Sequence, residues 1–123
     1  MAETVVILGA STNPNRYSHK AQLALLENGH TPVPVNPRYD QIDGIQCYPD
    51  LKSIPGGVDT ITVYVRPGII IPMTGDIIDI HPKRVIFNPG AESRAVAARL
   101  ESVGIAVQNA CTLVLLNTAH FTG

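Results

Sequence analysis

Small and polar residues follow the first apolar run of the chain, where a phosphate group could bind. The run at residues 4–8 ends in Gly9, Ala10 and Ser11. Glycine permits a tight turn, alanine lets the backbone approach a ligand, and serine offers a hydroxyl and an amide N–H to a phosphate. A helix that starts after such a turn adds free N–H groups and its positive dipole end. The segment therefore predicts a site for a phosphate-bearing nucleotide.

A polar loop after this turn carries two more groups that suit such a ligand. Arg16 and Ser18 stand at the start of an expected helix, where a guanidinium and a hydroxyl fit a diphosphate or a ribose. Small residues after a strand can also serve packing alone, and a polar loop can simply be solvated. Both interpretations stay open on these residues.

The turn departs twice from the usual dinucleotide fingerprint, Gly-x-Gly-x-x-Gly followed about 20 residues later by an acidic residue. Ser11 stands where the second glycine belongs, and the second apolar segment ends in Asn-Pro-Arg at residues 36–38, without a carboxylate. A plain ribose would lose its usual partner, whereas a phosphorylated ribose would gain Arg38 as a counter-charge. The residues favour coenzyme A or NADP over NAD.

The elements that must position these residues alternate between apolar strands and helices or long crossovers. Strands are predicted at residues 4–8, 31–35, 60–65, 84–87 and 105–108, and helices at 18–28, 70–80, 92–103 and 112–116. Such alternation favours parallel pairing through right-handed connections. We expect an α/β fold in one domain over residues 1–123, with a doubly wound, five-stranded parallel sheet in the order 3-2-1-4-5.

Two segments fit this scheme less simply. The second strand contains Pro32 and Pro34, which argue for an edge position or for partial pairing. The segment 38–57 is polar and broken by glycine and proline, and it predicts a long surface connection with one helical turn near Leu51. Ser18 or a neighbour is expected to cap the first helix.

Composition limits the classes of partner. Charged residues make up 15% of the chain and the formal net charge is −1, so no long-range field would gather a nucleic acid. No basic segment precedes an apolar stretch at the start, and no run approaches the roughly 20 apolar residues of a membrane span. We expect a soluble, cytoplasmic protein. Scattered histidines and two distant cysteines predict no metal site.

Cys111 allows a redox alternative to simple binding. It is expected at the carboxyl edge of the sheet near a helix start, where it could form a mixed disulfide with coenzyme A. A small thiol that fills a gap in the core is the simpler interpretation. An NADP-dependent oxidoreductase is the other alternative, although 123 residues leave little room for a substrate domain.

The strand-end motifs resemble those of small CoA-binding proteins of the succinyl-CoA synthetase α-subunit type. Members of that family begin V-x-x-V-G-A-S, continue through R-x-S and reach P-V-N-P, which correspond here to residues 5–11, 16–18 and 34–37. A further pattern, G-x-x-C-Y-x-x-L-x-x-I-P, is present at residues 44–55. The likeness covers nearly the whole chain.

This resemblance implies a Rossmann-like fold whose first turn, second strand end and third strand end enclose coenzyme A. Carried over by position, the binding residues would be Gly9, Ala10, Ser11, Arg16, Ser18, Asn36, Pro37, Val65 and Arg66. The synthetase subunits also have a second domain with a phosphorylated histidine, which we expect this chain to lack. The resemblance thus implies a module that binds coenzyme A or an acyl-CoA without a catalytic apparatus of its own. The isoleucine-rich segment 69–80 leaves room for a homodimer or another partner protein.

Overall fold

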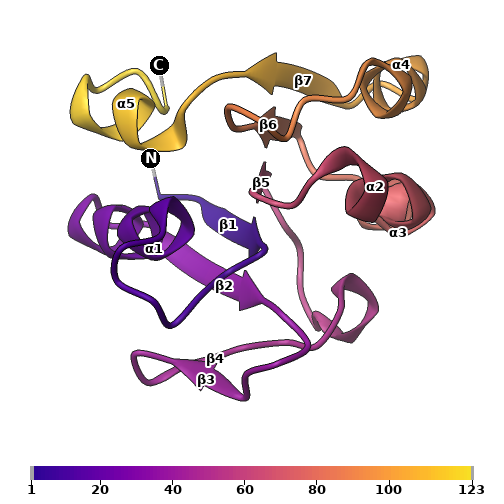
Figure 1. The fold of residues 1–123 in the computed structure, drawn as a ribbon. Coiled ribbons are helices and arrows are strands. Elements are labelled where there is room, and N and C mark those ends of the chain that lie inside the picture. Colours follow the sequence, from indigo (N-terminus) through magenta and orange to yellow (C-terminus); the bar gives the residue numbers. More distant parts are fainter. Residues whose placement is uncertain (1, 123) are drawn as a thin grey trace.

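The computed structural model describes residues 2–122 and contains a five-stranded, wholly parallel sheet with helices on both faces (Figure 1). Its strands are β1 (Thr4–Leu8), β2 (Thr31–Val35), β5 (Thr60–Val63), β6 (Arg84–Phe87) and β7 (Ala106–Asn109). The predicted fold class is therefore confirmed. The third and fifth strands differ from their predicted bounds by one or two residues at an end.

Helices α1 (Tyr17–Glu27) and α5 (Thr112–Asn117) cover one face of the sheet. The other face is covered by α2 (Pro67–Ile70), a 3-10 turn η2 (Ile71–Met73), α3 (Thr74–Ile80) and α4 (Arg94–Ser102). Within residues 2–122, no helix has the length and apolar character needed to cross a membrane.

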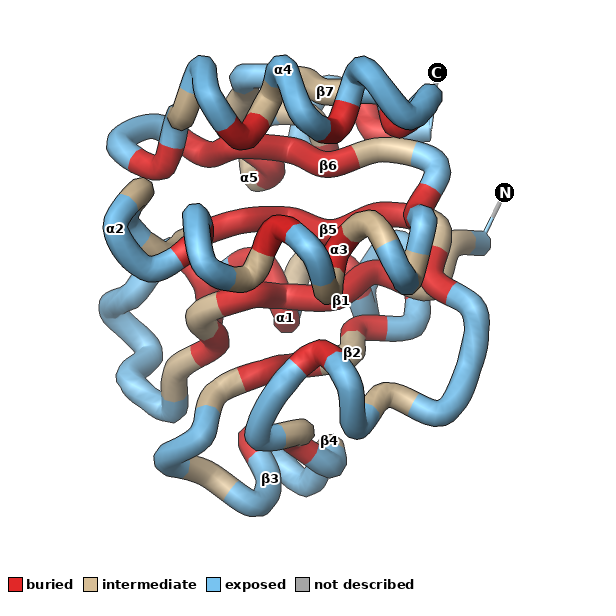
Figure 2. The backbone as a smooth tube through the Cα atoms, turned by 90° about the vertical axis from the view of Figure 1, so that its right-hand side faces the viewer, coloured by how far each residue is buried: buried red, intermediate tan, exposed pale blue. Residues whose placement is uncertain are grey.

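The sheet divides the apolar interior into two cores because neighbouring strand residues point to opposite faces. In β1, Val6 and Leu8 belong to the core beneath α2, α3 and α4, whereas Val5 and Ile7 belong to the core beneath α1 and α5. Figure 2 shows buried backbone running through β1, β5 and β6 while the helices alternate between buried and exposed turns. Burial on both faces explains why these strands contain almost no charged residues.

The predicted strand order is wrong in one respect. The order is β2-β1-β5-β6-β7, so the third predicted strand pairs with β1 rather than with β2, and β2 lies at the edge. The N–H of Thr31 and the C=O of Val35 form their hydrogen bonds on the side of β1. The backbone groups of Pro32 and Pro34 therefore face the outer side of the sheet. Proline has no N–H to offer a further strand there, so a full ladder cannot form.

Pro72 divides the predicted helix 70–80 into α2, η2 and α3. A proline inside a helix lacks the N–H for the bond four residues back and clashes with that carbonyl, which explains the break. The first helix begins at Tyr17 after Arg16, and no side chain caps it, so the predicted cap by Ser18 or a neighbour is wrong. Helix α4 begins after Ser93, whose Oγ accepts from the N–H of Val96 at 3.3 Å.

The segment 38–57 contains a small hairpin that the sequence analysis did not predict. Strands β3 (Gln41–Ile42) and β4 (Ile45–Gln46) pair antiparallel across Asp43 and Gly44, whose φ angles are 51° and 79°. Two successive positive φ angles are typical of the tight hairpin turn that Asp-Gly favours. The expected helical turn near Leu51 is present as the 3-10 turn η1 (Leu51–Ser53).

Candidate functional site

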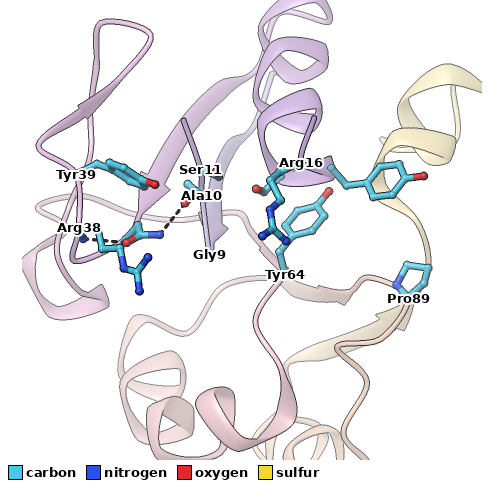
Figure 3. Close-up of a pocket in the computed structure, with 11 residues that line it drawn as sticks. Gly9, Ala10, Ser11, Arg16, Arg38, Tyr39, Tyr64 and Pro89 are labelled. Atoms are coloured by element: carbon cyan, nitrogen blue, oxygen red, sulfur yellow. Dashed lines mark hydrogen bonds between the residues drawn. The ribbon is translucent and has the colours of Figure 1, made fainter. Parts of the chain in front are cut away.

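A cavity of about 400 Å³ opens at the carboxyl edge of the sheet, above the ends of β1 and β2 (Figure 3). We call it the turn cavity. Its lining residues come from the first turn, the start of α1, the end of β2 and the ends of β5 and β6: Gly9, Ala10, Ser11, Arg16, Tyr17, Ser18, Asn36, Arg38, Tyr39, Tyr64 and Pro89. Seven of the ten residues predicted from the sequence are among them.

Gly9 shapes the floor of this cavity. Its φ is +93°, and a Cβ placed on it would lie 2.9 Å from Val65 Cγ1. The N–H groups of Gly9 and Ala10 both donate to the carbonyl of Val35, at 3.1 and 3.2 Å. These two amides therefore hold the turn against β2 and are not available to a ligand.

The donors that remain available lie slightly farther along the chain. In the part of the chain that the structure describes, the N–H groups of Ser11, Tyr17 and Ser18 have no hydrogen-bond partner. The Oγ of Ser11 accepts from the N–H of Asn13 at 3.0 Å, which leaves its O–H free to donate. The turn and the first turn of α1 thus present N–H and O–H donors to an anion.

Asn36 ties the two sides of the cavity together. Its Nδ2 donates to the carbonyl of Ala10 at 2.8 Å, and its Oδ1 accepts from the N–H of Arg38 at 2.9 Å. Each end of this amide makes one hydrogen bond within the protein. Asn36 therefore positions the first turn and the Arg38 backbone, and it keeps one N–H and one lone pair for a ligand.

The cavity carries positive charge from two sides. Figure 3 shows Arg16 on the side of Tyr64 and Arg38 on the opposite side, beside Tyr39. Both arginines are exposed, and neither has an ion pair within the described residues. No carboxylate lines the cavity. Unpaired guanidinium groups around free N–H donors suit phosphate oxygens, which accept such bonds strongly.

A second, more apolar cavity of about 260 Å³ adjoins the turn cavity and shares Gly9 and Asn36 with it. We call it the proline cavity because Pro37 and Pro49 line it. Val65 also lines it, so two further predicted residues reach this edge of the sheet. Arg66 is exposed at the N-cap of α2 and lines none of the three cavities described here, so the structure does not bring it into the site.

A third cavity of about 370 Å³ adjoins the turn cavity on its other side, where it shares Tyr17, Tyr64 and Pro89. We call it the Cys111 cavity. Its remaining lining residues are Asn88, Cys111, Leu113 and Val114. The three cavities together form a continuous series along the carboxyl edge, from β2 to the start of α5.

A buried polar network lies under the Cys111 cavity. Asn88 donates from Nδ2 to Thr62 Oγ1 at 2.7 Å and accepts at Oδ1 from the N–H of Thr112 at 2.9 Å. Thr62 and Thr112 share a hydrogen bond of 2.8 Å between their hydroxyls. Because all three residues are buried, these bonds fix the start of α5 and place Cys111 at its N-cap.

Three tyrosines that were not predicted from the sequence also line the turn cavity: Tyr17, Tyr39 and Tyr64. Tyr64 directly follows β5, so its place at a strand end was the available signal. Burial raises the pKa of Tyr64 to about 12, with the nearby hydroxyls of Thr62 and Thr112 opposing the rise. The Tyr64 hydroxyl is itself buried and has no hydrogen-bond partner.

The described residues offer no cluster of side chains that could bind a metal ion. Among residues 2–122, no group of three or more His, Cys, Asp or Glu side chains could hold a metal ion. The turn cavity is lined by guanidinium, hydroxyl and amide groups and by no carboxylate, which suits an anion.

Solved structures share the whole architecture. A crystal structure of an uncharacterised protein superposes with a TM-score of 0.92 and is 35% identical, covering 98% of this chain and 99% of that one. A conserved hypothetical protein of Pyrococcus furiosus is 32% identical with a TM-score of 0.78, covering 88% of this chain and 92% of that one.

Curated relatives share part of their length with this chain. Protein YneT of Bacillus subtilis is 32% identical over 72 residues, which are 55% of this chain and 53% of YneT. The ADP-forming acetate–CoA ligase of Methanocaldococcus jannaschii is 31% identical over 70 residues, 57% of this chain and 10% of the ligase. The chain thus spans about half of YneT and a tenth of the ligase. The family model described as a CoA binding domain matches residues 3–117, and the chain belongs to that family.

Proposed function

We propose that this chain binds coenzyme A, or an acyl-CoA, along the carboxyl edge of its sheet and acts as a binding module. The diphosphate would lie in the turn cavity, at the free N–H groups of Ser11 and Tyr17. The 3′-phosphate would pair with Arg38, and the adenine ring would enter the apolar proline cavity beside Pro37 and Val65.

The observation that carries this proposal is the charge of the turn cavity. Arg16 and Arg38 stand on opposite sides of a cavity that no carboxylate lines, and within residues 2–122 neither guanidinium has an ion pair. The protein as a whole has a formal net charge of −1, so this positive charge is local. A ligand with several phosphate oxygens matches it.

Family membership favours coenzyme A over NADP, the other nucleotide that Arg38 allows. The acetate–CoA ligases that share this region are named for a reaction that uses coenzyme A. The turn also lacks the second glycine of the dinucleotide fingerprint, since Ser11 stands in its place.

Calorimetric titration with coenzyme A, 3′-dephospho-CoA and NADP tests the proposal. We predict that the wild type binds coenzyme A about tenfold to a hundredfold more tightly than 3′-dephospho-CoA, since one charge-assisted contact is worth about 1.5–3 kcal/mol. Arg38→Gln should weaken the binding of coenzyme A by a similar factor and leave the affinity for 3′-dephospho-CoA nearly unchanged.

Arg99→Gln is the matched control, because Arg99 is exposed on α4 and lines none of the three cavities. It should bind all three ligands as the wild type does. Binding of NADP without coenzyme A, or of neither, would contradict the proposed function.

A further inference from the structure

The walls of the Cys111 cavity are apolar and open to solvent. Leu113, Val114 and Pro89 line it together with the rings of Tyr17 and Tyr64. Val114 is 56% exposed and Tyr17 65% exposed, which are the two highest values among the large apolar side chains exposed in residues 2–122. Exposed apolar side chains that gather around a cavity indicate a site for an apolar group.

Two phenol side chains, Tyr17 and Tyr64, line both this cavity and the turn cavity. The Tyr17 side chain is exposed, whereas the Tyr64 hydroxyl is buried without a hydrogen-bond partner. The hydroxyls of Thr62 and Thr112 lie near it and bond to each other at 2.8 Å. A buried hydroxyl without a partner is costly, and a ligand oxygen placed there would remove that cost.

The protonation state of Tyr64 suits donation. Burial raises its pKa to about 12, so the phenol keeps its proton at physiological pH. Asn88, a buried polar residue of the cavity wall, already uses its side-chain amide within the buried network. The Tyr64 hydroxyl is therefore the buried polar group of this wall that still has a hydrogen to donate.

We infer that the Cys111 cavity holds the acyl group of an acyl-CoA and that Tyr64 donates a hydrogen bond to the thioester carbonyl. An acyl thioester has one carbonyl oxygen followed by a hydrocarbon chain, which matches an unpartnered phenol hydroxyl in the wall of an apolar cavity. This inference rests on the proposed function, because the nucleotide in the turn cavity brings the acyl end to the adjoining cavity.

Two ligands that differ in the carbonyl oxygen test the hydrogen bond. Propionyl-CoA has it, and the thioether S-propyl-CoA lacks it. The wild type should bind propionyl-CoA about threefold to tenfold more tightly in calorimetry, and Tyr64→Phe should abolish that preference. Since the Tyr64 hydroxyl has no partner in the protein, Tyr64→Phe should keep the melting temperature of the wild type.

Tyr48→Phe is the control for loss of a phenol, because Tyr48 lies beside β2 and lines none of the three cavities. It should retain the preference for propionyl-CoA. Equal binding of the two ligands by the wild type, or a preference that survives Tyr64→Phe, would overturn the assignment of Tyr64.

A series from acetyl-CoA to butyryl-CoA to hexanoyl-CoA tests the apolar cavity. Each added methylene should tighten binding by about twofold to fourfold until the cavity is filled. Val114→Ser should flatten this trend, whereas Val103→Ser, at another exposed valine at the C-cap of α4, should not.

The outcomes separate the two proposals. If coenzyme A binds and affinity does not rise with chain length, the acyl site is wrong while the proposed function stands. If neither coenzyme A nor any acyl-CoA binds, both are wrong.

Discussion

At the scale of single residues, Gly9 controls the shape of the site. Its φ of +93° is rarely adopted by residues with a side chain, and a Cβ would lie 2.9 Å from Val65 Cγ1. We predict that Gly9→Ala lowers the free energy of unfolding by about 3 kcal/mol, since backbone strain and a close contact add. Urea denaturation followed by circular dichroism measures this change, and the same variant should lose affinity for coenzyme A.

Gly29→Ala separates these two causes. Gly29 also has a positive φ, +80°, but a Cβ there would meet nothing within 4 Å. Gly29→Ala should therefore lower the free energy of unfolding only by the backbone strain, about 1 kcal/mol. Equal losses in the two variants would show that the contact with Val65 has no energetic effect.

The residues that gather at this edge were largely predictable from the sequence. Parallel strands point their carboxyl ends to one edge, so each residue after an apolar run is a candidate. That logic places Gly9, Arg16 and Arg38 at the turn cavity, as observed. It does not predict which backbone amides are free to bind a ligand. In the structure, the amides of Gly9 and Ala10 donate within the protein and hold the turn.

Tyr64 was not predicted because an aromatic residue beside an apolar strand usually belongs to the core. Its ring does pack against the core beneath α1 and α5. Only the three-dimensional arrangement shows that its hydroxyl has no partner while the neighbouring threonines bond to each other. Whether a hydroxyl has a partner depends on how segments far apart in the chain pack together, and the sequence pattern does not show that packing.

At the scale of elements, the wrong strand order and the missed hairpin both involved signals that are present in the sequence. Pro32 and Pro34 exclude β2 from an interior position in the sheet. The predicted order placed this strand in the interior because that order is common in doubly wound folds, and the prolines should have decided against it. Asp43-Gly44 is a strong hairpin signal, but the flanking strands have only two residues each. So short a strand has no alternating pattern to detect.

The hairpin is held against α1 by a few polar contacts. His19 Nε2 lies 2.7 Å from Asp43 Oδ2, and Gln22 Nε2 donates to the carbonyl of Ile42 at 3.1 Å. Ile42 itself is buried in the core beneath α1 and α5. Because the hairpin follows Arg38 and Tyr39 directly, its docking restricts one side of the turn cavity.

We predict that Asp43→Gly loosens this hairpin while keeping its turn, since glycine adopts a positive φ without strain. Loss of the contact with His19 should cost about 1 kcal/mol, so the amide of Cys47 should exchange its hydrogen about fivefold faster. That amide donates to the carbonyl of Asp40 at 2.8 Å and reports on the closed hairpin.

Asp40→Asn is the control, because the Asp40 side chain has no hydrogen bond or ion pair within the described residues. Exchange at Cys47 should then match the wild type, and amides of β1 should be unaffected in both variants. Faster exchange throughout β1 in Asp43→Gly would mean that the hairpin contributes to global rather than local stability.

At the scale of the whole molecule, the two edges of the sheet have different electrostatic characters. At the amino edge the charges are paired: Arg84 contacts Glu3 at 3.4 Å, and Lys83 contacts Asp59 at 3.3 Å. At the carboxyl edge Arg16 and Arg38 have no such partners within residues 2–122. Other exposed cations of residues 2–122, such as Arg66 and Arg99, also lack ion pairs, but Arg16 and Arg38 face each other across a cavity that no carboxylate lines, which suits a ligand that supplies the anion.

Thermal unfolding with coenzyme A follows from this arrangement. A ligand at 100 times its Kd adds about 2.7 kcal/mol, which for a domain of this size is a rise of roughly 8–15 °C in melting temperature. Because exposed guanidinium groups are screened by salt, the rise should shrink when NaCl is increased from about 0.05 to 0.5 M at a fixed ligand concentration. Differential scanning fluorimetry measures both effects. A rise that does not depend on salt would mean that apolar contacts in the proline and Cys111 cavities, rather than Arg16 and Arg38, dominate binding.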